Sequence, residues 1–269
     1  MKVKAELYHD KFQNFKRYNI PKAQLVIADI PYNIGTNAYG SSLEWYIGGD
    51  RKNGESEKAG KAFFYTDVNF NIAEFFHFCN RLLKKEPKQR GQAPAMIVFC
   101  SYQQVPTVIA YGAKYGFPHN YPLYFIKSSS PQVLKANMKI VGAVETAMVL
   151  YRDKLPKFNN GGRMILNWFY WQKDGKEIPR IHQTQKPLNL LKQLIAIFTD
   201  PGDVVIDPCA GSGSTIRAAY ELGRHGYGFE TSRDFCREAQ EKMFANMPEY
   251  QRETENETIS LFDLLGANK

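Results

Sequence analysis

The stretch Asp203-Val-Val-Ile-Asp207-Pro-Cys-Ala-Gly211-Ser-Gly213-Ser-Thr215 decides the fold class of this chain. Its apolar run predicts a buried strand over residues 204–206, its glycines predict a turn, and the residues that follow predict a helix over 215–222. In a parallel α/β sheet, such a turn places a ligand at the carboxyl end of the strand, beside free N–H groups at the helix start. The stretch therefore predicts a ligand-binding loop.

An acid follows this loop at a spacing typical of nucleoside binding. Residues 226–229 form a further apolar run that ends in Glu230, nineteen residues after Gly211. A carboxylate there can accept hydrogen bonds from both hydroxyls of a ribose. Ile216 stands where a dinucleotide fold needs its third glycine, and Ser214 stands where a P-loop needs lysine. These residues argue against NAD and against ATP held by that motif, and a merely structural turn is the alternative to nucleoside binding.

Apolar runs and helical spacing alternate along the rest of the chain. The runs carry little polar alternation, as expected of strands buried on both faces. They predict strands over 25–28, 95–100, 121–126 and 146–151, and three-to-four spacing of apolar residues predicts helices over 71–85, 187–199 and 233–246. Strands that alternate with helices of this length indicate a doubly wound, mostly parallel α/β sheet.

Length and composition agree with one soluble domain. The chain has 269 residues, of which 43% are hydrophobic and 23% charged, so global disorder and a fibrous structure are excluded. No apolar stretch is long enough for a membrane span, and no signal-peptide core is evident. The four cysteines form no CxxC pair and the histidines lack the spacing of metal ligands, so neither a disulfide framework nor a metal site is expected. A cytoplasmic protein is the expectation.

Charge favours a polyanionic partner. Lysine and arginine (35) exceed aspartate and glutamate (27), which gives a net charge of +8. Residues 151–186 combine cations with aromatic rings, a pattern typical of nucleic-acid contacts, although a surface loop packed on the core is the alternative. The candidate DNA-binding residues are Arg152, Lys154, Lys157, Arg163, Lys173, Lys176 and Arg180. Residues 36–61, rich in glycine, serine and charge, predict a long mobile loop.

A second strand also ends in an acid. The sequence Leu25-Val-Ile-Ala-Asp29-Ile30-Pro31-Tyr32 supplies an acidic acceptor, a backbone carbonyl and an aromatic ring within four residues. Pro31 fixes its own φ and biases Ile30 toward an extended conformation. These groups suit a flat base that bears an exocyclic amine. An ordinary strand-to-loop turn with an inward-facing ring is the alternative.

With His182-Gln-Thr184-Gln185-Lys186-Pro187 between them, the two motifs resemble those of the β class of amino-methylating DNA methyltransferases. Residues 29–32 match the Asp-Pro-Pro-Tyr box of that family, and residues 207–213 match its Asp-Pro-Phe-x-Gly-x-Gly loop. Val144-Glu145-Thr-Ala-Met-Val-Leu150 looks like a further strand of the family. The resemblance spans residues 25–239. The chain departs from the pattern at Ile30, which replaces proline, and at Cys209, which replaces phenylalanine.

The resemblance implies transfer of a methyl group from S-adenosylmethionine to the N6 amine of adenine in DNA. Asp29 and the carbonyl of Ile30 are expected to bind the amine, Pro31 to shape the turn and Tyr32 to stack on the flipped base. The implied cofactor-binding residues are Asp207, Cys209, Gly211, Gly213, Glu230, Thr184, Gln185 and Lys186, the last three at the methionine end. Alternatives are cytosine N4, RNA or a protein amide as acceptor, and a non-catalytic nucleic-acid-binding module.

The remaining expectations concern the inserted segments and partners. Residues 36–61 are expected to close over the flipped nucleotide, and residues 152–180 to form the target-recognition insertion. The family is often dimeric, which leaves a homodimer open, and it implies a bacterial or phage origin with restriction-modification as one context. Thr258-Ile-Ser-Leu-Phe262 resembles the peptides that bind bacterial sliding clamps, with docking on its own domain or a sister subunit as the alternative.

Overall fold

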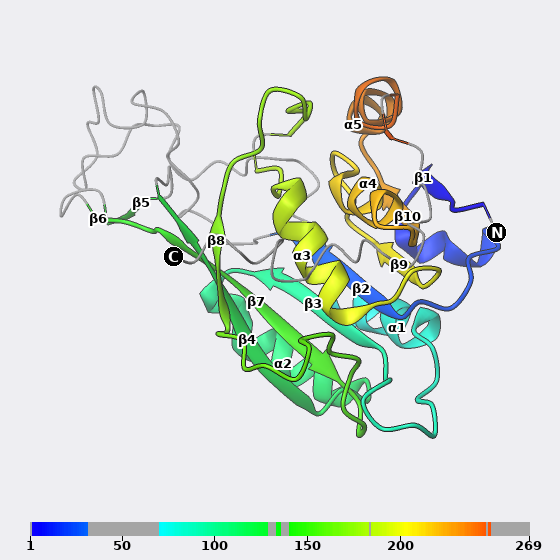
Figure 1. Cartoon of the computed structure of the whole chain (residues 1–269), viewed down its shortest axis with the longest axis vertical. Coiled ribbons are helices and arrows are strands. Elements are labelled where there is room, and N and C mark those ends of the chain that lie inside the picture. The colour runs from blue at the N-terminus through cyan, green and yellow to red at the C-terminus, as the bar shows by residue number, and fades with distance from the viewer. Residues whose placement is uncertain are drawn as a thin grey trace.

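A computed structural model describes residues 2–31, 70–128, 133–135, 140–182, 184–245 and 247–248. Its main sheet has the strand order β1-β10-β9-β2-β3-β7-β4-β8 (Figure 1). The strands are β1 (Ala5–His9), β2 (Leu25–Asp29), β3 (Ala95–Cys100), β4 (His119–Lys127), β7 (Val144–Tyr151), β8 (Trp168–Trp171), β9 (Val204–Asp207) and β10 (His225–Glu230). Strands β5 (Val133–Lys135) and β6 (Ile140–Val141) form a separate antiparallel pair.

The direction of the strands confirms the predicted mostly parallel sheet. Neighbours from β1 through β10, β9 and β2 to β3 pair in parallel, and β8 is parallel to β4. Strand β7 is antiparallel to both β3 and β4. Among the described strands of the main sheet, β7 alone runs opposite to the others. The six predicted strands are present, whereas the two edge strands, β1 and β8, were not predicted.

Helices cover both faces of this sheet (Figure 1). Helices α1 (Ile72–Leu82) and α2 (Val105–Lys114) pack on one face, and α3 (Leu188–Phe198) and α4 (Ser214–Glu221) pack on the other. Along β2, Val26 and Ala28 join the first core while Leu25 and Ile27 join the second. This alternation explains the continuous apolar run, because both faces of a covered strand are buried. Among the described helices, none has the length and apolar character needed to cross a bilayer.

Local sequence explains where the helices begin. The side chain of Asn71 caps α1 by accepting hydrogen bonds from the N–H groups of Ala73 and Glu74. Helix α2 was not predicted, because Pro106 and Gly112 interrupt its pattern. Proline is tolerated in the first turn of a helix. A Cβ at Gly112 would lie 2.4 Å from Leu150 Cδ2, so this glycine lets α2 pack closely on β7.

The predicted helix over 233–246 is shorter in the structure. Helix α5 spans Arg233–Glu238 and continues as a π-helix over Ala239–Met243. Short 3-10 helices span Phe12–Arg17, after β1, and Tyr102–Gln104, before α2. The latter matters for the site, because it follows directly on the carboxyl end of β3.

The topology also divides the stretch 152–180 that was predicted to be one insertion. Its middle part is β8, an edge strand of the main sheet that pairs with β4. The loop before β8 lies where β7 ends, at the amino-terminal ends of the parallel strands. The residues after β8 lie at the carboxyl ends of those strands. The stretch is therefore partly core, which corrects the prediction of a single inserted element. Residues 36–61 and 258–262 lie outside the described residues.

Candidate active site

Three carboxylates meet at one edge of the sheet because their strands are adjacent and parallel. Asp29 lies at the end of β2, Asp207 at the end of β9 and Glu230 at the end of β10, in a row of neighbouring strands. All three line a single pocket. The predicted meeting of the loop after β2 with the glycine loop after β9 is thus present in the structure.

The glycine loop gives this pocket one wall. Gly211 has a φ of 50°, and a Cβ there would meet nothing within 4 Å, so the backbone itself faces open space. Gly213 has a φ of 78°, but a Cβ there would lie 2.7 Å from Phe244 Cζ. Gly211 thus lines the pocket and permits close approach of a ligand, whereas Gly213 permits close packing at the start of α4. Gly213 is absent from the described lining, unlike the prediction.

The loop also holds Glu230 in place. Its Oε2 accepts a hydrogen bond of 2.8 Å from the N–H of Gly211, and its Oε1 accepts one of 2.7 Å from the N–H of Ser232. Burial raises the pKa of Glu230 above its ordinary value. A carboxylate has about four acceptor sites, so the two bonds leave acceptor capacity on both oxygens. Glu230 lines the pocket and fits a ribose with two hydroxyls.

Asp207 holds the glycine loop through a hydrogen bond to its backbone. It is buried, and its Oδ1 accepts a hydrogen bond of 3.0 Å from the N–H of Cys209. Burial raises the pKa of Asp207 to about 7, although hydrogen bonds from Thr215 and Cys209 act in the opposite direction. These contacts agree with the predicted role of Asp207 in orienting the loop. Cys209 lines the pocket as predicted, and burial raises the pKa of its thiol.

The turn after β2 is fixed by contacts that the sequence did not reveal. The N–H of Ile30 donates to the carbonyl of Phe99 at 3.2 Å, a bond that a proline at this position cannot make. Gln104 Nε2 donates to the carbonyl of Pro31 at 2.9 Å, and Gln104 Oε1 accepts from the N–H of Ser101 at 3.0 Å. Gln104 is therefore a residue of the site that sequence reasoning missed. Tyr32 lies outside the described residues.

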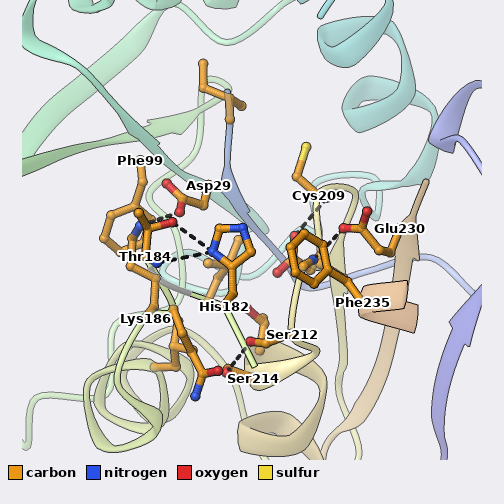
Figure 2. A pocket seen from close by; sticks show the side chains of 18 of the residues that line it. Asp29, Phe99, His182, Thr184, Lys186, Cys209, Ser212, Ser214, Glu230 and Phe235 are labelled. Atoms are coloured by element: carbon orange, nitrogen blue, oxygen red, sulfur yellow. Dashed lines mark hydrogen bonds and ion pairs between the residues drawn. The ribbon is translucent and has the colours of Figure 1, made fainter. Parts of the chain in front are cut away.

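Lys186 and Asp29 lie against each other in the lining of the pocket (Figure 2). Its ammonium contacts Asp29 Oδ2 and lies 3.5 Å from Glu145 Oε2. Burial acts to lower the pKa of Lys186, but the negative charges of Asp29 and Glu145 outweigh it and raise the pKa. The resemblance had implied a contact of Lys186 with the methionine end of the cofactor. In the structure its ammonium pairs with the carboxylates of Asp29 and Glu145.

The other residues of the predicted 184–186 segment also line the pocket. The side chain of Gln185 is used locally: its Oε1 accepts from Ile181 N–H at 3.1 Å, and its Nε2 donates to the Pro179 carbonyl at 3.0 Å. The N–H of Thr184 donates to His182 Nδ1 at 3.2 Å. Gln185 therefore shapes the segment, while Thr184 remains beside the cavity.

His182 is a pocket residue that the sequence analysis left without a function. Figure 2 shows its ring between Asp29 and Phe235. The rings of His182 and Phe235 have their centroids 4.7 Å apart, and both residues line the pocket. Burial and the charge of Lys186 lower the pKa of His182 to about 4, so the ring is neutral near pH 7. Its position two residues before Thr184 was the signal available in the sequence.

The predicted DNA-binding residues lie at both ends of the strands, some at the pocket end and some at the opposite end. Arg152 follows β7 at the edge opposite the pocket, where it donates to the Lys84 carbonyl at 3.0 Å and to Asn80 Oδ1 at 2.9 Å. Lys154 Nζ donates to the Pro87 carbonyl at 2.7 Å. Buried Lys157 pairs with Asp200. These three cations are used within the fold, which argues against the predicted DNA contacts for them.

The remaining four predicted cations are exposed. Arg163 lies in the loop that precedes β8, at the edge opposite the pocket. Lys173, Lys176 and Arg180 follow β8, whose carboxyl end lies at the pocket edge because β8 is parallel to β4. Of the two described segments that flank β8, the one after it therefore leads from the sheet toward the pocket.

Comparison with known proteins identifies the family. The family N6_N4_Mtase, described as DNA methylase, matches residues 23–241, and this chain belongs to it. The DNA adenine methyltransferase YhdJ of Escherichia coli K12 is 26% identical over 270 residues, which cover 87% of this chain and 81% of YhdJ. The type II methyltransferase M.HindIII of Haemophilus influenzae is 55% identical over 49 residues, which cover 18% of this chain and 16% of that protein.

Solved structures show the same fold. The M1.HpyAVI–SAM complex superposes with a TM-score of 0.63 at 22% identity, with coverage of 88% of this chain and 97% of that chain. The PvuII DNA methyltransferase, titled cytosine-N4-specific, superposes with a TM-score of 0.63 at 15% identity, with coverage of 98% and 93%. The predicted methyltransferase-type α/β sheet is thereby confirmed.

Proposed function

We propose that this protein methylates the N6 amine of adenine in DNA. As a member of the DNA methylase family, it is a DNA amino methyltransferase, and its methyl donor is S-adenosylmethionine. One observation carries the proposal: Asp29 and Ile30, at the end of β2, line the same cavity as Gly211 and Glu230. A target amine and a nucleoside cofactor bound by these groups share one space.

The residues of the cofactor half fit this donor. The open backbone at Gly211 admits a ligand where a side chain would project into the cavity. Glu230 is held by two backbone N–H groups and keeps acceptor sites for ribose hydroxyls. When bound, S-adenosylmethionine supplies a methyl group on a sulfonium, whose carbon–sulfur bond breaks with the electron pair left on sulfur. The protein's task is therefore orientation and electrostatics.

The amine-binding half addresses the weakness of the acceptor. An exocyclic amine shares its lone pair with the ring and is a poor nucleophile. The Asp29 carboxylate and the Ile30 carbonyl accept its two N–H groups, which draws the nitrogen toward tetrahedral geometry and frees the lone pair to form the new N–C bond. Asp29 also stabilises the positive charge that develops on nitrogen before a proton is released to solvent. Tyr32 stacks on the base in this proposal.

Two features support adenine as the base. The box begins with Asp29, which in the resembling family favours adenine N6, and the relative YhdJ is named an adenine methyltransferase. Cytosine N4 is the second candidate, because the PvuII enzyme titled cytosine-N4-specific has the same fold. Both amines suit the pair formed by Asp29 and the Ile30 carbonyl.

DNA contact is proposed for the segment after β8. Lys173, Lys176 and Arg180 are exposed on the stretch that leads from β8 to the pocket-lining residue His182. Cations at this edge hold phosphates beside the cavity while the target base is flipped out of the duplex. The predicted closing role of residues 36–61 stays part of the proposal.

The test is methyl transfer to DNA followed by identification of the nucleoside. Purified protein, unmethylated plasmid and tritiated S-adenosylmethionine are incubated, and the digested DNA is analysed by mass spectrometry. N6-methyldeoxyadenosine supports the proposal, N4-methyldeoxycytidine supports the second candidate, and absence of both contradicts it.

A pair of variants assigns the transfer to this pocket. Asp29→Asn is expected to abolish transfer but to retain S-adenosylmethionine binding measured by calorimetry. Asp153→Asn, at an exposed position that follows β7 on the opposite edge, is the matched control and keeps full activity. Unimpaired transfer by Asp29→Asn contradicts the assignment.

A further inference from the structure

Four charged side chains form a row of ion pairs at the pocket. Lys127 contacts Glu145 Oε1, Glu145 Oε2 lies 3.5 Å from Lys186 Nζ, and Lys186 contacts Asp29 Oδ2. The side chains of Lys186 and Glu145 are only 8% and 13% exposed, whereas Asp29 is 30% exposed toward the pocket. Two cations and two anions balance, so these four side chains bury no net charge, whereas removal of one member would leave an uncompensated buried charge.

Lys186 has two carboxylates within reach but is bonded to one of them. Its contact with Asp29 is a hydrogen bond, whereas its distance to Glu145 Oε2 exceeds hydrogen-bond length. Among the described residues, Glu145 Oε2 has no hydrogen-bond partner, although it is buried. A buried carboxylate oxygen in this position gains considerably from a donor. A shortening of about 0.7 Å brings the ammonium to a charge-assisted bond with Glu145.

The surroundings of Lys186 keep it charged during such a movement. Its ammonium lies 5.0 Å from the ring centroid of Phe99 and 5.5 Å from that of Trp171. The ring centroid of Trp171 also lies 4.4 Å from the ammonium of Lys127. Aromatic faces attract a cation without a preferred hydrogen-bond direction, so the ammonium can turn between the two carboxylates.

We infer that Glu145 is a positioning residue that acts through Lys186: when the target amine donates to Asp29, Lys186 turns from Asp29 to Glu145. This inference rests on the proposed function of Asp29. A carboxylate whose charge is neutralised by an ammonium is a weaker acceptor for the amine, because both donors share the same negative charge. Glu145 thus determines how much of the Asp29 charge is available to the base.

The experiment measures how much the amine contributes to binding. The recognition sequence is first found by sequencing DNA methylated by the wild-type protein. Two duplexes are then compared, one with the target adenine and one with purine, which lacks the amine, at that position; 2-pyrimidinone replaces a cytosine target. The readout is the ratio of the two dissociation constants in the presence of sinefungin, a non-reactive analogue of the methyl donor.

The variants are expected to move this ratio in opposite directions. Lys186→Met leaves the Asp29 charge to the amine and raises the preference for the amine-bearing duplex about tenfold. Glu145→Gln removes the charge that attracts Lys186 and lowers the preference, together with kcat for methyl transfer. Lys127→Gln removes the second cation that contacts Glu145, so the Glu145 charge attracts Lys186 more strongly and the preference for the amine-bearing duplex rises. Gln193→Leu, a partly buried position on α3 outside the pocket lining, serves as a control for general destabilisation and leaves the ratio unchanged.

The outcomes distinguish the inference from the function on which it rests. Absence of any methylated base with the wild-type protein contradicts the proposed function. If the wild-type protein is active but all three variants leave the ratio unchanged, the inference is overturned. It is also overturned if Glu145→Gln and Lys127→Gln shift the ratio in the same direction, since a purely structural role predicts no opposition between them. A ratio that rises in Lys186→Met and falls in Glu145→Gln supports it.

Discussion

Removal of the Gln104 side chain is expected to slow methyl transfer without weakening cofactor binding. Gln104 Nε2 donates to the Pro31 carbonyl at 2.9 Å, across 73 residues of chain, and its Oε1 accepts from Ser101 N–H at 3.0 Å. It therefore fixes the turn that carries Asp29 and the Ile30 carbonyl to the end of β3. Where the family has the first proline of its Asp-Pro-Pro-Tyr box, this chain has Ile30, so the turn depends on such bonds.

The size of the effect follows from these contacts. Loss of one partly buried hydrogen bond lowers the free energy of unfolding by about 1 kcal/mol, and the unsatisfied groups of Ser101 and Pro31 bring the loss for Gln104→Leu to about 2 kcal/mol. A misplacement of the reacting groups by about 1 Å lowers kcat about 100-fold. Because Gln104 does not line the pocket, the dissociation constant of S-adenosylmethionine is expected to change less than twofold.

The assay compares three variants by single-turnover methyl transfer, calorimetry and urea unfolding. Gln104→Leu removes both bonds, Gln104→Glu keeps the acceptor for Ser101 and loses the donor to Pro31, and Gln103→Leu changes an exposed neighbour as the control. Equal loss of kcat in both Gln104 variants assigns the effect to the Pro31 contact. A Gln104→Leu protein that is less stable but transfers methyl groups at the wild-type rate would refute this reasoning.

Further predictions concern the cofactor loop and the DNA surface. Glu230→Gln is expected to weaken S-adenosylmethionine binding about tenfold, because hydrogen bonds to a charged acceptor are stronger than those to a neutral one; calorimetry measures this, and unchanged affinity contradicts the ribose assignment. The pKa of Asp207 is raised to about 7 in the folded state from 3.8, so the unfolded state loses its proton first and stability falls as pH rises from about 4 to about 7. Asp207→Asn should remove this decrease in the free energy of unfolding, which amounts to at most about 4 kcal/mol. Urea unfolding at several pH values measures it, and a variant whose stability still falls with pH as in the wild type contradicts the prediction. Lys173→Ala and Lys176→Ala should each lower the salt dependence of DNA binding by about one charge, whereas Lys157→Ala should lower stability and leave that slope unchanged; the reverse pattern in salt titrations would place the DNA elsewhere.

The sequence by itself determined the parts of the protein that depend on local pattern. The apolar runs of β2, β3 and β9 predict buried strands because both faces of each strand pack against helices. Gly211 predicts a backbone open to a ligand, since its positive φ suits a residue without a side chain. Asp29 and Glu230 follow their strands directly, so the parallel sheet alone carries both to one edge.

The tertiary structure decided which side chains meet at that edge. Lys186 and Asp29 are 157 residues apart, and nothing in the sequence around either one specifies the other as its partner. Glu145 reaches the pocket because β7 runs against its neighbours, which also carries Arg152 to the far edge and into contacts within the fold. Local periodicity records whether a residue is buried, whereas strand direction and pairing arise from packing of the whole chain, and these place each charge beside its partner.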